Sequence, residues 1–444
     1  MRAAWLLLLL PAIAGAQEWK ASGYLETDAR AAFPREGDQH WERIQSSLAL
    51  RLEGAPEPRL RVVADGRAIH RAEPDARRST IGERTPEPPW RLDGDAFFVE
   101  ARGLGTTGTG WLRAGRQTVR WGRGLVAAPA SVVSPPDLED PLRFGSPRGS
   151  QMIRALVPIG SRVKVEGIAV HSFQPALLPP VTARDALATS GVPAAENLAN
   201  DPAWTVDLRL RDPLPPATFA NMPLAARVTG DLPFLAAEIG VSAYRGRSAL
   251  PEVASADLEV DFAAKRLGGE VTLVYPRMQM LGAEAALEVP VPLLDAVGVF
   301  GEAVWIEPEG FKRTTTALGV EQRVTVLDEP YLRGVAGVER AGDTYFAIEW
   351  SRGFVDEFGK SRQRDYLFAI AERRFLRETV SVRVVAAHCL DDGSLLLAPE
   401  AGWSPRDAIT LSLAAYAGFG AGDSKFAGPL AGDRVVLARA RASF

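Results

Sequence analysis

The feature that most constrains this chain is an alternation of apolar and polar residues, with a period of two, that recurs along most of its length. Successive side chains of an extended strand point to opposite sides, so each alternating segment has one apolar and one polar face. The pattern predicts an all-β chain, and no break in it marks separate domains. The clearest segments are RIQSSLALRLE (43–53), RVKVEG (162–167), WTVDLRLRD (204–212) and ADLEVDFA (256–263).

Two environments produce this alternation. A soluble antiparallel sheet packs its apolar face on a core and leaves its polar face in water, whereas a transmembrane barrel turns its apolar face to lipid. Both signs of charge recur on the polar faces, as a wet interior requires, and so many strands would curl or split unless the sheet closed. The pattern therefore favours a closed antiparallel transmembrane β-barrel of about 18 strands, within a range of about 16 to 22.

The connections between the alternating segments are of two kinds. Short stretches rich in Gly, Pro, Asp and Ser, such as GTTGTG (105–110) and AGD (341–343), predict tight turns. Longer polar or Pro-rich stretches predict long loops, which in such barrels lie at one end. The expected long loops lie near 71–93, 123–150, 174–202, 353–362 and 418–432.

The amino-terminal stretch MRAAWLLLLLPAIAGAQ has the layout of a secretory signal peptide. Arg2 precedes an apolar run that is too short to span a bilayer as a helix, and small residues precede the expected cleavage after Ala16. We therefore expect residues 1–16 to be removed and residues 17–444 to form a single barrel domain outside the cytoplasm.

Composition excludes several classes of protein. The net charge of −4 gives no nucleic-acid footprint, and the single cysteine, Cys389, excludes an intramolecular disulfide framework. The four histidines lie near no G-x-S-x-G or H-E-x-x-H pattern, so we expect no enzymatic activity. No cluster of metal ligands stands out, and we expect no cofactor.

Two further features carry a resemblance to a known class. The chain ends in LARARASF, an alternating strand that closes on Phe444. Residues 111–141, WLRAGRQTVRWGRGLVAAPASVVSPPDLEDP, contain a GRQ…WG strand followed by a Pro- and Asp-rich loop. Together they resemble the porin-like β-barrels of Gram-negative outer membranes, although Ser134 stands where the family loop has Asn. The resemblance implies that Phe444 belongs to the signal that the barrel-assembly machinery reads.

Charged residues in the alternating segments and in the loop at 123–150 are the candidate pore-lining residues. Rings of arginine bias a pore toward anions, and a loop of this length is often functional. A solvated face with cancelling charges and an ordinary external loop are the alternatives. The candidates are Arg113, Arg116, Arg120, Arg123, Asp137, Glu139, Asp140, Arg143, Asp207, Arg209, Arg211, Asp257, Glu259 and Asp261.

The expected function is passive diffusion of small polar solutes or ions through an outer-membrane channel of a Gram-negative bacterium. Its expected partners are membrane lipid, the barrel-assembly machinery and the solute, but not nucleic acid; whether identical chains associate is left open. One alternative is a barrel that exports or binds a lipid or polysaccharide with a periplasmic partner. Another is a secreted, soluble all-β binding or structural protein.

Overall fold

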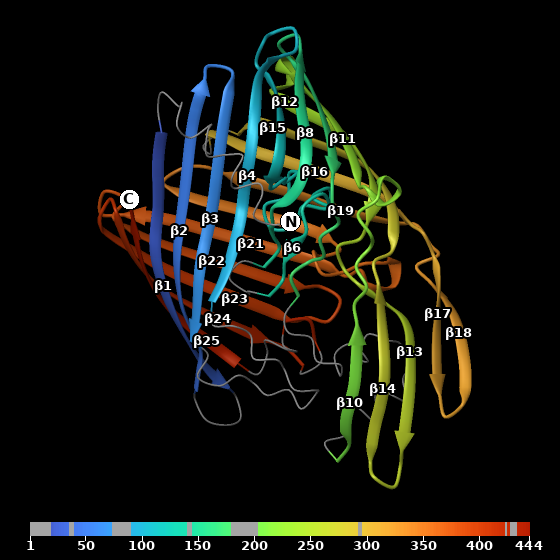
Figure 1. Ribbon diagram of the computed structural model, residues 1–444. Coiled ribbons are helices and arrows are strands. Elements are labelled where there is room, and N and C mark those ends of the chain that lie inside the picture. The colour runs from blue at the N-terminus through green and yellow to red at the C-terminus, as the bar shows by residue number, and fades with distance from the viewer. Residues whose placement is uncertain are drawn as a thin grey trace.

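The computed structural model describes residues 19–34, 40–72, 90–139, 144–178, 203–291, 295–421, 424–426 and 433–444. The expected signal peptide and the loop around 73–89 lie outside the described residues. Eighteen strands form one sheet (Figure 1). They are β1 (Trp19–Pro34), β2 (His40–Glu57), β3 (Leu60–Ala72), β4 (Trp90–Leu104), β5 (Gly110–Gln117), β8 (Ser150–Ile159), β9 (Val163–Val170), β11 (Leu224–Leu232), β12 (Ala237–Arg247), β15 (Arg277–Val291), β16 (Asp295–Pro308), β19 (Tyr331–Arg340), β20 (Thr344–Arg352), β21 (Asp365–Phe375), β22 (Val380–Cys389), β23 (Leu395–Arg406), β24 (Ile409–Phe419) and β25 (Asp433–Ser443).

The sheet closes on itself because its first strand, β1, pairs with its last, β25, from Tyr24–Ser443 to Pro34–Asp433. Each strand is antiparallel to both neighbours, so the ring has no free edge. Beyond the last strand, Phe444 exchanges two backbone hydrogen bonds with Gly23, at 2.9 and 3.0 Å between nitrogen and oxygen. The prediction of a closed antiparallel barrel of about 18 strands is confirmed.

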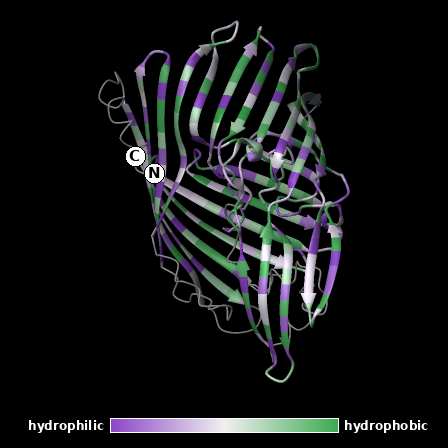
Figure 2. Cartoon of the chain, turned by 45° about the vertical axis from the view of Figure 1, so that its right-hand side comes forward, coloured by the Kyte–Doolittle hydropathy of each residue, from purple (hydrophilic) through white to green (hydrophobic). Residues whose placement is uncertain are grey.

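The period of two sets which side chains face outward. In β2, Leu48 and Leu50 are 49% and 43% exposed on the outer face, whereas Gln45 and Ser47 are 6% and 3% exposed inside the ring. Figure 2 shows the alternation of hydropathy as green and purple bands along the strands. Large apolar side chains cover the outer wall on many other strands, among them Leu92, Ile153, Val241, Leu281, Ile348 and Leu413.

Two of the clearest alternating segments do not belong to the barrel wall, which corrects the sequence analysis. They form β10 and β13 of a separate five-stranded sheet, which projects beyond the wall at the lower right of Figure 1. Leu208 and Leu258 are buried in this sheet's own apolar core, so they are not on the outer face of the barrel wall. The sheet contains β10 (Thr205–Arg211), β13 (Glu252–Asp261), β14 (Arg266–Val274), β17 (Phe311–Ala317) and β18 (Val320–Val326).

The long connections share one end of the barrel. The segments that leave from this end, which we call the loop end, include 118–149, 171–223, 248–276, 309–330 and 353–364. The opposite end, the turn end, carries short connections such as 105–109, 160–162 and 341–343. Residues 105–110 thus form a turn with the start of β5, as predicted. The other elements are the two-stranded β6 (Pro136–Asp137) and β7 (Ser146–Pro147), and the 3₁₀ turns η2 (Phe219–Asn221), η3 (Pro233–Leu235) and η4 (Lys360–Arg362).

Within the described residues, no helix has the length and apolar character needed to cross a bilayer.

Candidate functional site

The segment between β5 and β8, residues 118–149, turns into the ring instead of extending outward (Figure 1). Its glycines and prolines make it a poor strand. At Gly122 the backbone has a φ of +95°, and an added Cβ would lie 2.2 Å from a carboxylate oxygen of Glu302 on β16. Glycine is required there both by the left-handed backbone and by this close approach. We call residues 118–139 and 144–149 the inner loop.

Two carboxylates on the wall across the ring hold the inner loop by its backbone. Glu302 on β16 accepts hydrogen bonds from Arg123 N, at 2.8 Å, and from Ala130 N. Glu349 on β20 accepts from Leu125 N, Val126 N and Ala127 N, the last at 2.9 Å. Counting round the 18-stranded ring from β5, β16 is the sixth strand and β20 the eighth, so the inner loop crosses the lumen.

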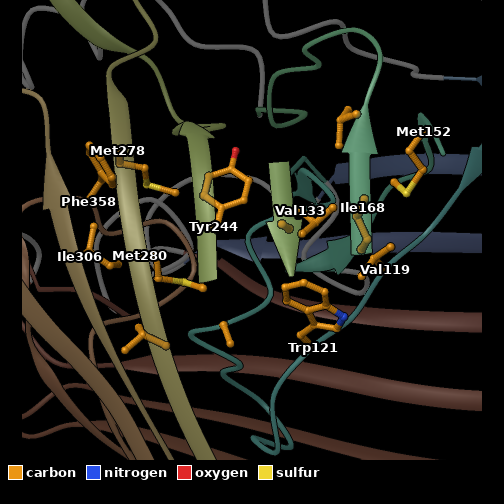
Figure 3. Close-up of a cluster of buried hydrophobic side chains, with 14 of the residues drawn as sticks. Val119, Trp121, Val133, Met152, Ile168, Tyr244, Met278, Met280, Ile306 and Phe358 are labelled. Atoms are coloured by element: carbon orange, nitrogen blue, oxygen red, sulfur yellow. The ribbon is translucent and has the colours of Figure 1, made fainter. Parts of the chain in front are cut away.

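Apolar packing adds to these hydrogen bonds on one side of the lumen. Trp121 is 1% exposed, and its indole Nε1 donates to Glu166 of β9 at 3.1 Å. Figure 3 shows this ring beside Val119 and Val133 of the inner loop, with side chains from several wall strands around them. The inner faces of these strands are apolar because the inner loop covers them and excludes water. The wall residues of this cluster include Met152, Ile168, Tyr244, Met280, Val304 and Ile306.

The far end of the inner loop is held to β3 and β4 by charge. Glu139 accepts from Arg71 and from Arg91, the latter at 2.8 Å. Burial raises the pKa of this carboxyl, but hydrogen bonds and charges from the two guanidinium groups outweigh burial, so its pKa is lowered overall. Because the pKa of Glu139 is lower in the folded protein, its ionised form stabilises the fold at any pH above the ordinary glutamate pKa. This stabilisation is lost as the pH falls through the lowered pKa. Ser134 Oγ also braces the loop internally by accepting from Val119 N at 2.8 Å.

The rest of the lumen is lined by partly exposed charges of both signs, on β2 to β5 and on β25. On β2, Arg51 and Glu53 have side chains 42% and 34% exposed. Arg102 of β4 is 49% exposed and pairs with Glu100 at 2.5 Å. Arg441 of β25 is 44% exposed. Their exposure inside the ring, in contrast to the 1% of Glu349, indicates the part of the lumen that water can reach.

The four arginines singled out in the sequence lie in different surroundings. Arg113 on β5 pairs with Glu100 at 2.6 Å and stacks on Trp111, 3.9 Å from the ring centroid. Arg116, near the end of β5, donates to Gly94 O.

Arg120 and Arg123 are in the inner loop and not on a strand, since β5 ends at Gln117. Arg120 donates to Gly124 O and Leu125 O at 2.9 and 3.0 Å. Arg123 pairs with Glu238 and lies 3.8 Å from Glu284. The expectation that GRQ…WG forms one strand is therefore wrong, because Trp121 and Gly122 also lie beyond the end of β5.

A polar recess brings some of the expected residues together beside the inner loop. Arg116 and Asp137 line it, and room remains for about 10 Å³, the space of roughly one water molecule. The other lining residues are Arg67, Asp93, Gly94, Asp95, Ser146, Pro147 and Arg148.

Six other candidates lie on the five-stranded sheet, away from the barrel wall: Asp207, Arg209, Arg211, Asp257, Glu259 and Asp261. There Asp207 pairs with Arg266, and Arg211 pairs with Glu270 at 2.8 Å. Asp140 and Arg143 lie outside the described residues.

Three residues that hold the inner loop were not among the candidates predicted from the sequence: Glu166, Glu302 and Glu349. The alternation places each on a polar face, but it does not show that a distant loop supplies the hydrogen-bond donors. One signal was available for two of them. Glu302 and Glu349 are single carboxylates within otherwise apolar strand segments, FGEAVWI and YFAIEW, and such a carboxylate needs a buried partner.

Comparison with solved structures places the fold. This chain is similar to the outer membrane protein OpdK of Pseudomonas aeruginosa, with a TM-score of 0.54 and 7% sequence identity. The match covers 97% of this chain and 99% of OpdK. OccAB1 of Acinetobacter baumannii matches at 0.53 and 9%, covering 97% of both chains. OccD3 (OpdP) of Pseudomonas aeruginosa matches at 0.51 and 7%, covering 97% and 93%.

One of the matching OpdK structures was determined with vanillate. No family model matches the sequence, and no curated protein matches it. At these identities the likeness shows the fold, which is that of these outer-membrane barrels.

Proposed function

We propose that this protein is a channel of a Gram-negative outer membrane, through which small polar solutes or ions diffuse without a cofactor or a catalytic step. The observation that carries the proposal is the asymmetric lumen. The inner loop is fixed across the ring to Glu302 and Glu349, and partly exposed charges line the opposite part of the wall. A loop fixed in this way narrows the passage while leaving a polar path beside it.

A membrane location is supported by the outer surface. Leu413, Val241 and Ile348 are 58%, 58% and 52% exposed near the middles of their strands. A soluble protein rarely exposes so continuous an apolar belt, whereas lipid makes it favourable. The long loops then lie on the extracellular side and the turns, with both chain ends of the barrel, on the periplasmic side. The terminal strand and Phe444 would be read by the assembly machinery, and residues 1–16 would direct export.

The direct test is conductance of the purified mature chain in a planar bilayer. We expect discrete steps, and a sealed, non-conducting barrel would contradict the proposal. Because OpdK has been seen with vanillate, small aromatic carboxylates are the first solutes to test by liposome swelling. A channel of this kind should admit such an acid and exclude a polysaccharide of the same charge.

Selectivity tests the lumen residues. Arg116 lies beside the inner loop and Arg120 within it, and we propose that both favour anions in the pore. Replacing both with Glu should shift the reversal potential in a salt gradient toward cations. The matched control changes Arg209 and Arg211 to Glu on the five-stranded sheet, which alters the charge equally but outside the wall. An equal shift of the reversal potential in both variants would show that Arg116 and Arg120 do not line the ion path.

A further inference from the structure

Three arginines gather on the outer face of the barrel wall at the loop end. Arg245 and Arg247 are two residues apart on β12, and Arg247 pairs in register with Arg277 on β15. Neighbouring strands are about 5 Å apart, and residues i and i+2 of one strand are about 7 Å apart. The three residues therefore lie close together on the outer face, and we call them the arginine cluster.

The three arginines outnumber the two nearby carboxylates, Glu307, which lines the groove described below, and Glu309, whose charge acts on Arg247. Like charges directly opposite one another across a strand pair are destabilising. Among the described residues, none of the ion pairs involves Arg245, Arg247 or Arg277. Arg247 and Arg277 instead both donate to the amide oxygen of Asn221, at 3.0 and 3.1 Å. An anion bound between the guanidinium groups would relieve the repulsion.

An apolar groove lies directly below the arginine cluster on the same outer face. It has a volume of about 370 Å³, and Arg245 stands at its polar side. Its floor includes Ala226 and Ala243, which pair in register, and its rim includes Trp305, which is 47% exposed. Leu224, Gln279, Leu281 and Glu307 also line it on the outer face.

Along the barrel axis, the order of charged and apolar residues matches the order of the headgroup and acyl chains in a lipid. Toward the turn end, the next outward row on the same strands is apolar, with Val228 paired with Val241 and Ala283 paired with Ala303. Toward the loop end, η2 presents Phe219 with 92% exposure, two residues from the Asn221 that receives the arginines. The arginine cluster lies nearer the loop end, the groove lies nearer the turn end, and an exposed aromatic side chain lies beside the arginines. This arrangement is expected where a protein surface crosses a membrane interface.

We propose that this face binds one lipid molecule of the surrounding leaflet, with its phosphate on the arginine cluster and an acyl chain in the groove. The inference rests on the membrane location proposed above. It adds a specific lipid site to the general contact with the bilayer, and it identifies that lipid as one whose head carries a phosphate.

The test is native mass spectrometry of the full mature chain, delipidated in detergent and titrated with dioleoylphosphatidylglycerol or with uncharged dioleoylglycerol. We expect the phosphate-bearing lipid to bind and the uncharged one to bind at least about tenfold more weakly. Changing Arg245, Arg247 and Arg277 to Gln should weaken phosphatidylglycerol binding by a similar factor. The control changes three exposed arginines at the turn end, Arg373, Arg377 and Arg406, to Gln and should bind as the wild type does.

A second variant separates the groove from the charges. Ala226→Leu with Ala243→Leu fills the groove but leaves the arginines, and it should also weaken phosphatidylglycerol binding. Unchanged binding by either variant would overturn the proposal. Competition by inorganic phosphate as effective as by the lipid would reduce the site to a simple anion site, and dimerisation of the lipid-free chain through this face would assign it to a second copy. Failure to conduct, measured separately in a neutral bilayer, would instead count against the channel.

Discussion

Glu302 and Glu349 act through backbone donors, so their effect does not depend on which side chains the inner loop carries at those positions. Each takes hydrogen bonds from loop N–H groups that would otherwise be buried without a partner. A typical hydrogen bond contributes about 0.5–1.5 kcal/mol, and loss of the acceptor leaves a buried donor unpaired, at a cost of about 1–3 kcal/mol. A few wall side chains therefore position the whole constriction.

Replacing Glu349 with Ala should release the centre of the inner loop. Three backbone donors lose their acceptor, and we expect larger and noisier single-channel conductance in a planar bilayer. Glu349→Gln keeps an acceptor oxygen and should have a smaller effect. Glu321→Ala, at an exposed position on β18, is the control. Conductance equal to the wild type in Glu349→Ala would mean that the inner loop does not limit the pore.

At the scale of elements, the same alternating pattern has two outcomes. In β2 and β24 it separates the outer face of the barrel from the lumen, whereas in β10 and β13 it separates a small apolar core from water. The five-stranded sheet forms because three successive loop-end connections each contribute strands: 171–223, 248–276 and 309–330. Arg362 of η4 ties this sheet to another loop by a bidentate pair with Glu252, at 2.6 and 3.0 Å.

Leu208 is 4% exposed in the core of the five-stranded sheet. Leu208→Ala should destabilise that sheet by about 2–5 kcal/mol, through lost burial and the cavity left behind. Hydrogen exchange should increase in the strands of this sheet, residues 205–211, 252–274 and 311–326, while the barrel keeps its resistance to SDS. Exchange that rises equally throughout the barrel strands would show that the sheet is not a separable unit.

Leu413 faces outward near the middle of β24 and is 58% exposed. Leu413→Arg should lower the free energy of unfolding in lipid vesicles by about 2–4 kcal/mol, because the charge would lie at the bilayer midplane. Leu413→Met, which keeps an apolar side chain, is the matched control. A neutral result for Leu413→Arg would place this face in water and would argue against a membrane barrel.

At the scale of the whole molecule, closure depends on the pairing of the two ends of the chain. β1 meets β25 over eleven residue pairs, and Phe444 continues the pairing to Gly23. The ring of Phe444 lies against Gly23, where an added Cβ would be 2.8 Å from Cζ. Phe444 thus contributes to the pairing of β1 with β25, which we call the seam. This contribution is separate from any recognition of Phe444 by the assembly machinery.

Deletion of Phe444 should reduce the amount of folded barrel in the outer membrane, because the seam loses two backbone hydrogen bonds and an aromatic contact. The measurement is the fraction of the protein that shifts in mobility when boiled in SDS. Phe444→Tyr should restore it. Normal levels of the truncated protein would contradict a role for Phe444 in closure or assembly.

The sequence by itself determined the strand class, the closed architecture and the approximate strand number, since an alternating chain in lipid must satisfy every backbone group. It also identified residues 123–150 as the irregular segment. Only the tertiary structure decided which alternating segments enter the wall, where the inner loop goes and which carboxylates hold it. The reason is physical: alternation records that one face avoids water, but whether lipid, a small core or a returning loop covers that face depends on contacts between residues far apart in the chain, such as Glu349 and Ala127.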